Sequence, residues 1–281
     1  MKYKGAIFTD LDGTFLDPTG KVSTKNIDAL NLLSKHNIAR VVCTGRTLDS
    51  SGEVAPQHLP FDFLIFSSGA GICNFSDRKI LCKHEIAHND IVALADFFLQ
   101  KQLDFSIHFP IPKNHFFYWY SGPTKSADLI SRLHYLKDFA VEGTTTHIKE
   151  MKSATQFLAI VHDSMIESVI KEAQNSFANL SFIRATSPLN QNYSWIEVFP
   201  KDINKGSGAN WLCNYLGISK SHAMAIGNDY NDIHMLEWAS PNSYIMADSP
   251  KELLEKFKIA PTNAEDGFAT AVTQWLQQLK A

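Results

Sequence analysis

The sequence predicts an α/β protein whose open, parallel sheet is interrupted by an inserted α+β domain. Short apolar runs alternate with helical patterns at the start of the chain and again at its end, which is the order of a parallel α/β sheet. The stretch between them has strands and helices in mixed order. At 281 residues the chain is long enough for about two domains. We therefore expect a core made from both ends of the chain, with the middle folded separately.

The first strands of the predicted core are short and apolar. Residues 5–9 form an apolar run that ends at a carboxylate, and a helical pattern follows after Ser23 or Thr24. Two more apolar runs, at 38–43 and 63–66, each end at a polar turn. Such continuous runs are typical of strands that are buried on both faces of a parallel sheet.

The middle of the chain has a different order of elements. It is predicted to contain helices at 89–101 and 164–177 and strands near 105–108, 116–120, 156–161 and 180–184. This mixed order is typical of an α+β domain. The alternating pattern then returns, with helices at 207–216, 232–239 and 267–279 and strands at 223–226 and 243–246. The predicted core is thus 1–82 and 194–281, and the predicted insertion is 83–193.

The composition is that of an ordinary globular protein and argues against several kinds of partner. Hydrophobic residues make up 44% of the chain, charged residues make up 20%, and the formal net charge is -3. Nucleic-acid binding would call for a basic patch, which the sequence lacks. There is no apolar run of about 18 residues to suggest a membrane span, and no apolar segment near the N-terminus to suggest export. The four cysteines are widely spaced and fit reduced thiols, so we expect a cytoplasmic protein. Nothing in the sequence indicates an oligomeric state.

Two carboxylates stand where the first predicted strand ends. Asp10 and Asp12 are two residues apart, so both can point toward one hard cation, and oxygen ligands suit magnesium. Asp10 could also act as a nucleophile that forms an aspartyl phosphate, with Asp12 as the acid and base. Gly13 would let the backbone approach a phosphoryl oxygen, and Thr14 would add a donor. The alternative is an ordinary turn, in which Asp and Gly are common.

Two further polar positions follow or precede core elements. Thr44-Gly45-Arg46 closes the second strand, where a hydroxyl could donate to a phosphoryl oxygen and a guanidinium could pair with substrate charge. The alternative there is a strand-to-helix turn with an exposed arginine. Lys205 precedes a predicted helix, and its ammonium would neutralise a transferring phosphoryl group in the crevice. The alternative is a solvated lysine, and Lys201 is a nearby rival.

A loop rich in Asn and Asp follows the first strand of the C-terminal part. The amide and carboxylate oxygens of Asn228, Asp229 and Asp232 suit completion of a magnesium shell. The alternative is a helix-capping stretch, because these residue types favour helix N-termini. Ligands of open α/β sheets bind at the carboxyl ends of the strands, so the loop should lie beside Asp10 and Asp12. With those carboxylates present, we prefer the metal interpretation.

The order and spacing of these motifs resemble those of the haloacid dehalogenase superfamily of phosphatases. The motifs are DLDGT, TGR, Lys205 with Gly206, and GNDYND. The large insertion between the second and third motifs is similar to that of the Cof-type subclass, IIB, as is the tail segment NAEDGF at 263–268. The resemblance implies a Rossmann-like parallel-sheet core with an inserted α+β cap that governs substrate specificity. It also implies a magnesium-dependent phosphatase acting on a small phosphorylated metabolite such as a sugar phosphate.

The resemblance further implies roles for single residues. Asp10 would be the nucleophile, Asp12 the general acid and base, and Lys205 the charge-neutralising ammonium. The implied phosphate- and substrate-binding residues are Leu11, Gly13, Thr14, Thr44, Gly45, Arg46 and Asn231. The implied magnesium ligands come from Asp10, the backbone carbonyl of Asp12, Asn228, Asp229 and Asp232.

Two positions depart from the family pattern. The fourth motif usually begins Gly-Asp, whereas this chain has Asn228, whose amide oxygen can bind magnesium but carries no charge. Either Asn228 is a ligand, or Asp229 or Asp232 contributes through a shift or a bridging water. Ser68 stands where the family commonly has asparagine, so a contact to the substrate is expected to differ there.

The insertion is rich in aromatic residues, which we interpret as half-buried strands of the cap sheet rather than as a sugar-binding wall. These residues are Phe105, Phe109, Phe116, Phe117, Tyr118, Trp119 and Tyr120. His108 and His115 are expected to be structural or exposed.

Two rival functions stay open. One is a phosphomutase or phosphotransferase that returns the phosphoryl group to a second hydroxyl, and the other is a binding protein with little turnover, suggested by Asn228.

Overall fold

The computed structural model describes residues 3–279, and its contacts divide the chain into two compact units. The core unit consists of the chain up to residue 46, residues 50–82 and the chain from residue 204 onward. The cap unit consists of residues 47–49 and 83–203. Each unit has a sheet and a hydrophobic core of its own, so the predicted α/β fold class is confirmed.

The core unit is built on an eight-stranded sheet whose order within the described residues is β16-β15-β14-β1-β2-β3-β4-β5. Neighbouring strands from β16 to β3 pair in parallel, and β4 is antiparallel to β3. The strands are β1 (Gly5–Thr9), β2 (Ile38–Cys43), β3 (Phe63–Phe66), β4 (Gly71–Asn74), β5 (Ile80–Lys83), β14 (Ala223–Gly227), β15 (Ser243–Met246) and β16 (Lys258–Ala260). Every residue of β1, β3, β14 and β15 is buried, as the apolar runs predict for a sheet covered on both faces.

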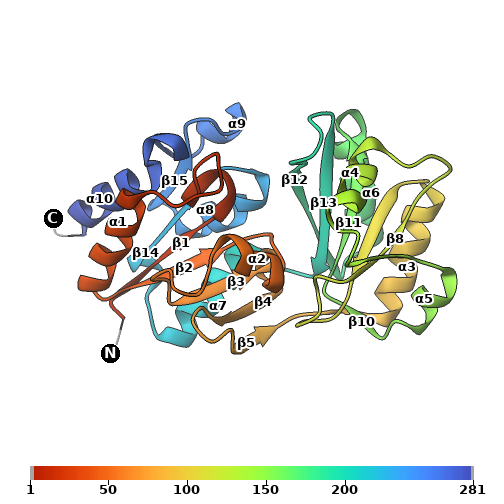
Figure 1. Ribbon diagram of the computed structural model, residues 1–281, viewed down its shortest axis with the longest axis horizontal. Coiled ribbons are helices and arrows are strands. Elements are labelled where there is room, and N and C mark those ends of the chain that lie inside the picture. The colour runs from red at the N-terminus through yellow and green to blue at the C-terminus, as the bar shows by residue number, and fades with distance from the viewer. Residues whose placement is uncertain (1–2, 280–281) are drawn as a thin grey trace. The chain divides into compact units, whose positions relative to one another are not determined.

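Helices cover the core sheet in two groups (Figure 1). They are α1 (Thr24–Lys35), α2 (Leu48–Val54), α7 (Lys205–Leu216), α8 (Ile233–Ala239), α9 (Lys251–Leu254) and α10 (Gly267–Gln278). Helices α7 and α8 pack on the face that carries Phe8, Val41 and Ile65. Helices α1 and α10 lie side by side on the opposite face (Figure 1). The Ser23 hydroxyl accepts from the Asn26 N–H at 3.1 Å, which caps α1 at its predicted start.

The cap unit is an α+β domain with a six-stranded sheet ordered β12-β13-β11-β7-β8-β9 within the described residues. Its strands are β7 (Asp104–His108), β8 (Phe117–Tyr120), β9 (Ala140–Glu142), β11 (Gln156–His162), β12 (Leu180–Thr186) and β13 (Tyr193–Pro200). A small separate pair is formed by β6 (Ile86–Ala87) and β10 (Ser153–Ala154). The helices are α3 (His88–Gln100), α4 (Ala127–Tyr135), α5 (Thr145–Glu150) and α6 (Ile166–Ser176).

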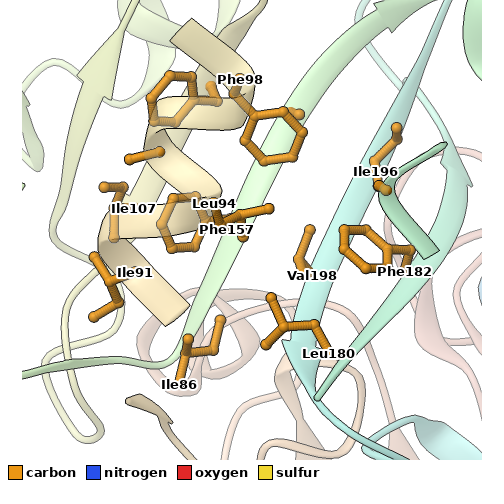
Figure 2. Packing of buried hydrophobic residues seen from close by; sticks show 14 of the residues in the cluster. Ile86, Ile91, Leu94, Phe98, Ile107, Phe157, Leu180, Phe182, Ile196 and Val198 are labelled. Carbon is orange, nitrogen blue, oxygen red and sulfur yellow. The ribbon is translucent and has the colours of Figure 1, made fainter. Parts of the chain in front are cut away.

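Both faces of the cap sheet are covered by helices. Phe98 of α3 and Phe157 of β11 belong to the larger cluster, which also includes residues of α6. Figure 2 shows side chains of this cluster that come from α3, β7, β11, β12 and β13. On the other face, Leu129 of α4 packs with Phe117, Trp119 and neighbouring side chains. The aromatic residues of β7 and β8 therefore serve mainly as core, in line with the interpretation from the sequence.

The second boundary of the insertion lies later than the sequence suggested. Residue 194 was expected to mark the return to the core, but β13 pairs with β11 along Tyr193–Val198 and with β12 along Ser194–Pro200. The cap unit consequently extends to Ile203. The reason is that a mainly apolar run such as Trp195–Phe199 looks the same in a parallel and in an antiparallel sheet. Within residues 3–279, none of the helices combines the length and the apolarity needed to cross a membrane.

Candidate active site

The predicted functional residues of the core unit gather where β14, β1 and β2 end. These strands are neighbours in the sheet, so the turns after their carboxyl ends lie next to one another. Asp10 follows β1, Thr44 follows β2 and Asn228 follows β14. The Asp10 N–H donates to the carbonyl of Ile226 at 3.0 Å, which ties the backbone at Asp10 to the neighbouring strand.

Lys205 joins two of these turns. Its ammonium donates to Asp10 Oδ1 at 2.7 Å and to Asp232 Oδ1 at 2.6 Å. The lysine is 1% exposed and Asp232 is fully buried, so solvent screens this triad poorly. Lys205 is therefore placed as an internal cation rather than as a solvated lysine, whereas its rival Lys201 is exposed in the cap unit.

Asp232 uses both carboxylate oxygens within the protein. Besides the Lys205 ammonium on Oδ1, its Oδ2 accepts from the backbone N–H groups of Asn228 at 2.8 Å and Asp229 at 3.1 Å. This geometry favours a role for Asp232 in shaping the loop and holding Lys205, and it makes Asp232 a weaker candidate than Asn228 or Asp229 for a direct metal ligand.

The buried charges alter one another's ionisation. Burial raises the pKa of Asp10 to about 8, opposed by the Lys205 ammonium and reinforced by the charges of Asp232 and Asp12. Burial by itself would lower the pKa of Lys205, but the two carboxylates outweigh it and raise that pKa. Lys205 is thus held in its charged form. The Lys205 ammonium only partly offsets the burial of Asp10, and a further cation beside Asp10 would favour its ionised form.

Asp12 forms a bidentate ion pair with Arg46. The guanidinium donates from Nε to Oδ2 at 2.6 Å and from its second terminal nitrogen to Oδ1 at 2.8 Å. Both side chains are partly open to solvent. The sequence suggested that Arg46 would pair with charge on the substrate. In the structure its partner is the carboxylate predicted to act as the general acid and base.

Gly13 and Thr14 pack against Asn228. Gly13 has φ +73°, and a Cβ at this position would lie 2.3 Å from the amide nitrogen of Asn228, so only glycine fits. The Thr14 hydroxyl donates to Asn228 Oδ1 at 3.2 Å. The first and fourth motifs are therefore in direct contact, and the amide oxygen of Asn228 faces the turn that begins at Asp10.

The remaining predicted site residues differ in how far they are buried. Thr44 is buried, and its hydroxyl accepts from the Arg46 N–H at 3.2 Å, which fixes the turn while leaving its own proton available to a ligand. Leu11 is buried, so its contribution to phosphate binding would come from its backbone. Gly45 and Asn231 are partly exposed on their turns.

Two structural features of the site had weak sequence signals. The side chain of Asn204 caps α7 by accepting from the Ser207 N–H at 2.9 Å. Asn204 and Ser207 form a capping box, which sets the start of the helix at Lys205. The second feature is the turn Ser67–Gly69 after β3, in which all three residues have positive φ. The sequence drew attention only to Ser68.

The donor set of this site suits a hard cation held largely by oxygen. In the described part of the chain, no group of three or more His, Cys, Asp or Glu side chains is placed to hold a metal. A magnesium shell here would therefore combine the Asp10 carboxylate with the Asp12 backbone carbonyl, the Asn228 amide and Asp229. Those are oxygen donors of the kind that magnesium prefers, and the shortage of positive charge around Asp10 fits such an ion.

Comparison with known proteins decides the family. The family model described as haloacid dehalogenase-like hydrolase matches residues 7–272, which includes every motif of the site. The chain belongs to this family. The resemblance inferred from the motifs is confirmed, and with it the expectation of a phosphatase-type enzyme.

Several proteins similar to this haloacid dehalogenase-like hydrolase match over nearly their whole length. The 5-amino-6-(5-phospho-D-ribitylamino)uracil phosphatase YwtE of Bacillus subtilis is 26% identical over 290 residues, which cover 96% of this chain and 97% of that protein. The solved structure of the subclass IIB sugar phosphatase BT4131 has a TM-score of 0.75 at 19% identity, covering 96% of this chain and 98% of that one. The phosphatase BT1666 of Bacteroides thetaiotaomicron has a TM-score of 0.78 at 19% identity, with 97% and 95% covered. At these identities the two structures establish the fold.

Proposed function

We propose that this protein is a magnesium-dependent phosphatase that hydrolyses a small phosphorylated metabolite through an aspartyl phosphate on Asp10. The buried Asp10–Lys205–Asp232 triad carries the proposal. A buried ammonium in contact with a carboxylate at the strand ends is the arrangement that phosphoryl transfer to that carboxylate requires, because the reaction develops negative charge on the phosphoryl oxygens.

The first chemical step is attack by Asp10 on phosphorus. Lys205 holds Asp10 Oδ1, so Oδ2 is the attacking oxygen, and the bond to the leaving oxygen breaks as the new bond forms. Asp12 gives its proton to the leaving alkoxide. Lys205 and the Thr44 hydroxyl stabilise charge on the phosphoryl oxygens, and a bound magnesium ion would supply further electrostatic stabilisation there.

The second step regenerates the enzyme. Asp12 removes a proton from water, the water oxygen attacks phosphorus, and the bond to Asp10 breaks to release inorganic phosphate. Asp12 must be free to exchange protons in both steps, so its ion pair with Arg46 has to loosen during turnover. Charge on the substrate phosphoryl group is the natural competitor for that guanidinium.

We propose phosphorylated sugars and polyols as the substrate class. YwtE, which is named for a substrate with a phosphorylated ribityl chain, and the sugar phosphatase BT4131 support this choice. We further propose that the cap unit governs which organic group is accepted, because the catalytic residues all belong to the core unit.

A phosphate-release screen tests the proposal. The purified protein is incubated with magnesium and a panel of sugar, polyol and aryl phosphates, with Asp10→Asn as the inactive control. We expect inorganic phosphate from wild type and none from the variant. Transfer to a second hydroxyl without phosphate release would instead indicate a phosphotransferase. Absence of any magnesium-dependent turnover in wild type would contradict the proposed function.

A further inference from the structure

The turn Ser67–Gly69, which follows β3, has an unusual backbone. Its three residues have φ values of 45°, 48° and 104°, and all three are buried. Two consecutive serines in the left-handed region are strained, since only glycine adopts positive φ without steric cost. Strain of this kind persists where the surrounding structure enforces it, and it gathers at functional sites.

One side of this turn holds the second motif. The Ser67 N–H donates to the Arg46 carbonyl at 2.8 Å, and the Ser68 N–H donates to the Thr44 carbonyl at 3.0 Å. Both bonds come from consecutive left-handed residues, so the strained conformation is what presents two adjacent N–H groups to the Thr44–Arg46 turn.

The other side of the turn holds the N-terminus of α7. A Cβ on Gly69 would lie 2.3 Å from the Asn204 carbonyl oxygen, so the two backbones are in close contact. A Cβ on Gly208 would lie 3.4 Å from the Gly69 Cα. Asn204 caps α7, and Lys205 is the first residue of that helix. The position of the turn therefore sets where Lys205 enters the site.

We propose that Ser67–Gly69 is a positioning element that sets the Lys205 ammonium and the Thr44 hydroxyl in register for phosphoryl transfer. It acts through the backbone contacts described above. The inference rests on the proposed function, because Lys205 and Thr44 are assigned their roles there. It explains why strain is retained at a buried position whose side chains are small.

Gly69→Ala tests the proposal, with Gly217→Ala as the matched control. Gly217 also has positive φ, at 68°, and lies at the opposite end of α7, but a Cβ there has nothing within 4 Å. The control thus carries the backbone cost without the clash. We expect Gly69→Ala to lower kcat by about 100-fold through misplacement of Lys205. The control should keep kcat within about twofold of wild type, since backbone strain away from the site carries no catalytic penalty.

A double-mutant cycle separates positioning from general damage. If Gly69 acts through Lys205, adding Gly69→Ala to Lys205→Ala should change kcat by less than about twofold, because coupled residues give non-additive losses. The full loss appearing again in the Lys205→Ala background would overturn the proposal. Gly208→Ala is the milder second variant, since its Cβ would lie 2.9 Å from Ile65. It should lose about three- to tenfold in kcat, and its loss should likewise vanish without Lys205.

A crystal structure of Gly69→Ala gives a readout that does not need turnover. We expect the Asn204 carbonyl to retreat and the Lys205 Nζ to leave Asp10 Oδ1. A distance unchanged from 2.7 Å would reject the inference. Absence of phosphatase activity in the wild type would reject the proposed function. The crystal structure of Gly69→Ala would still test the positioning role in that case.

Discussion

Asp10, Lys205 and Asp232 form a chain of buried charges whose members depend on one another. Lys205 is enclosed by two carboxylates, and Asp232 also supports the Asn228 loop through two backbone N–H groups. Removing one member of such a set leaves a buried charge without its partner, which costs more than the pair itself contributes. The catalytic site and the stability of the core unit are therefore linked at these residues.

Asp232→Asn tests that linkage. The amide has one acceptor oxygen instead of two and carries no charge, so Lys205 loses an anionic partner, and the oxygen can accept from either the lysine or the loop N–H groups but not from both sides. We expect the free energy of unfolding of the core unit to fall by about 3 kcal/mol, together with a loss of kcat. Urea unfolding followed by circular dichroism measures the first effect. Glu237→Gln on the exposed side of α8 is the control, and equal stability of the two variants would contradict the linkage.

Asn228 is a proposed magnesium ligand without a charge. Its amide oxygen faces the first motif, where Thr14 donates to it, but it contributes no negative charge. We expect Asn228→Asp to tighten magnesium binding by about tenfold, because one more ligand charge at close range is worth on the order of 1 kcal/mol in a partly screened site. Isothermal titration with magnesium measures the change. Loss of binding in Asp229→Ala but not in Asn228→Ala would show that the ligand assignment is wrong.

At the scale of elements, local patterns were sufficient for the five central strands of the core sheet, but they missed β4, β5 and β16 and were insufficient for the pairing of the cap. The runs that became β1, β2 and β3 are mainly apolar and are followed by polar turns, so their type could be predicted from a few residues. β13 could not be placed, because its membership of the cap sheet depends on its pairing with β11 and β12.

In the candidate site too, some features could be predicted from the sequence and others could not. The residue types at Asp10, Lys205 and Asn228 predicted the site, since carboxylate, ammonium and amide groups each follow or precede a core element. The ion pair between Asp12 and Arg46 was not predictable, because the motifs are 34 positions apart and only their geometry makes them partners. The left-handed turn at Ser67–Gly69 was missed as well, because serine gives no sequence signal for positive φ.

His108 on β7 makes the cap unit sensitive to acid. One ring nitrogen contacts the Asn114 carbonyl at 2.8 Å, and the other faces the Arg132 guanidinium at 3.3 Å and the Ser106 hydroxyl at 3.4 Å. Burial, reinforced by the Arg132 charge, lowers the pKa of His108 to about 3. The neutral ring of His108, stacked on Phe117, is thus the form that the folded cap accepts.

The sign of the resulting pH dependence is fixed by this depressed pKa. In the unfolded chain a histidine has a pKa of about 6.5. Below that pH the unfolded state therefore binds a proton that the folded state does not bind. The free energy of unfolding should be unaffected by His108 above about pH 6.5 and should fall by up to about 1.4 kcal/mol per pH unit down to about pH 3. Urea unfolding at several pH values, compared with His108→Gln, checks this. An NMR titration that shows His108 protonating near its ordinary pKa would refute it.

At the scale of the whole molecule, the chain forms two separate hydrophobic cores, because the segment that folds as the cap unit is inserted within the segment that folds as the core unit. The core unit takes both ends of the chain and the cap unit takes the middle, and each has its own buried cluster. All of the proposed catalytic residues lie in the core unit, whereas the cap contributes the stretch that differs most from a simple α/β pattern.

Phe157→Ala tests whether the two cores are energetically separate. Phe157 is fully buried in the cap cluster, and its truncation should destabilise the cap unit by about 3–5 kcal/mol. Since the proposed ligands belong to the core unit, magnesium affinity should stay at the wild-type value. Differential scanning calorimetry and magnesium titration on the same variant measure the two quantities. A parallel loss of magnesium affinity would contradict separate cores.

The central claim is that Asp10 carries the phosphoryl group during turnover. With an aryl phosphate, whose phenolate can leave without a proton from Asp12, Asp12→Asn should form this aspartyl phosphate and hydrolyse it slowly, because the base that activates water is missing while the nucleophile remains. Acid quenching of that variant with substrate and magnesium, followed by borohydride reduction and peptide mass spectrometry, locates the acyl phosphate as homoserine. We predict homoserine at position 10. Phosphate release by wild type with no modification at Asp10, or with modification at another carboxylate, would contradict the account.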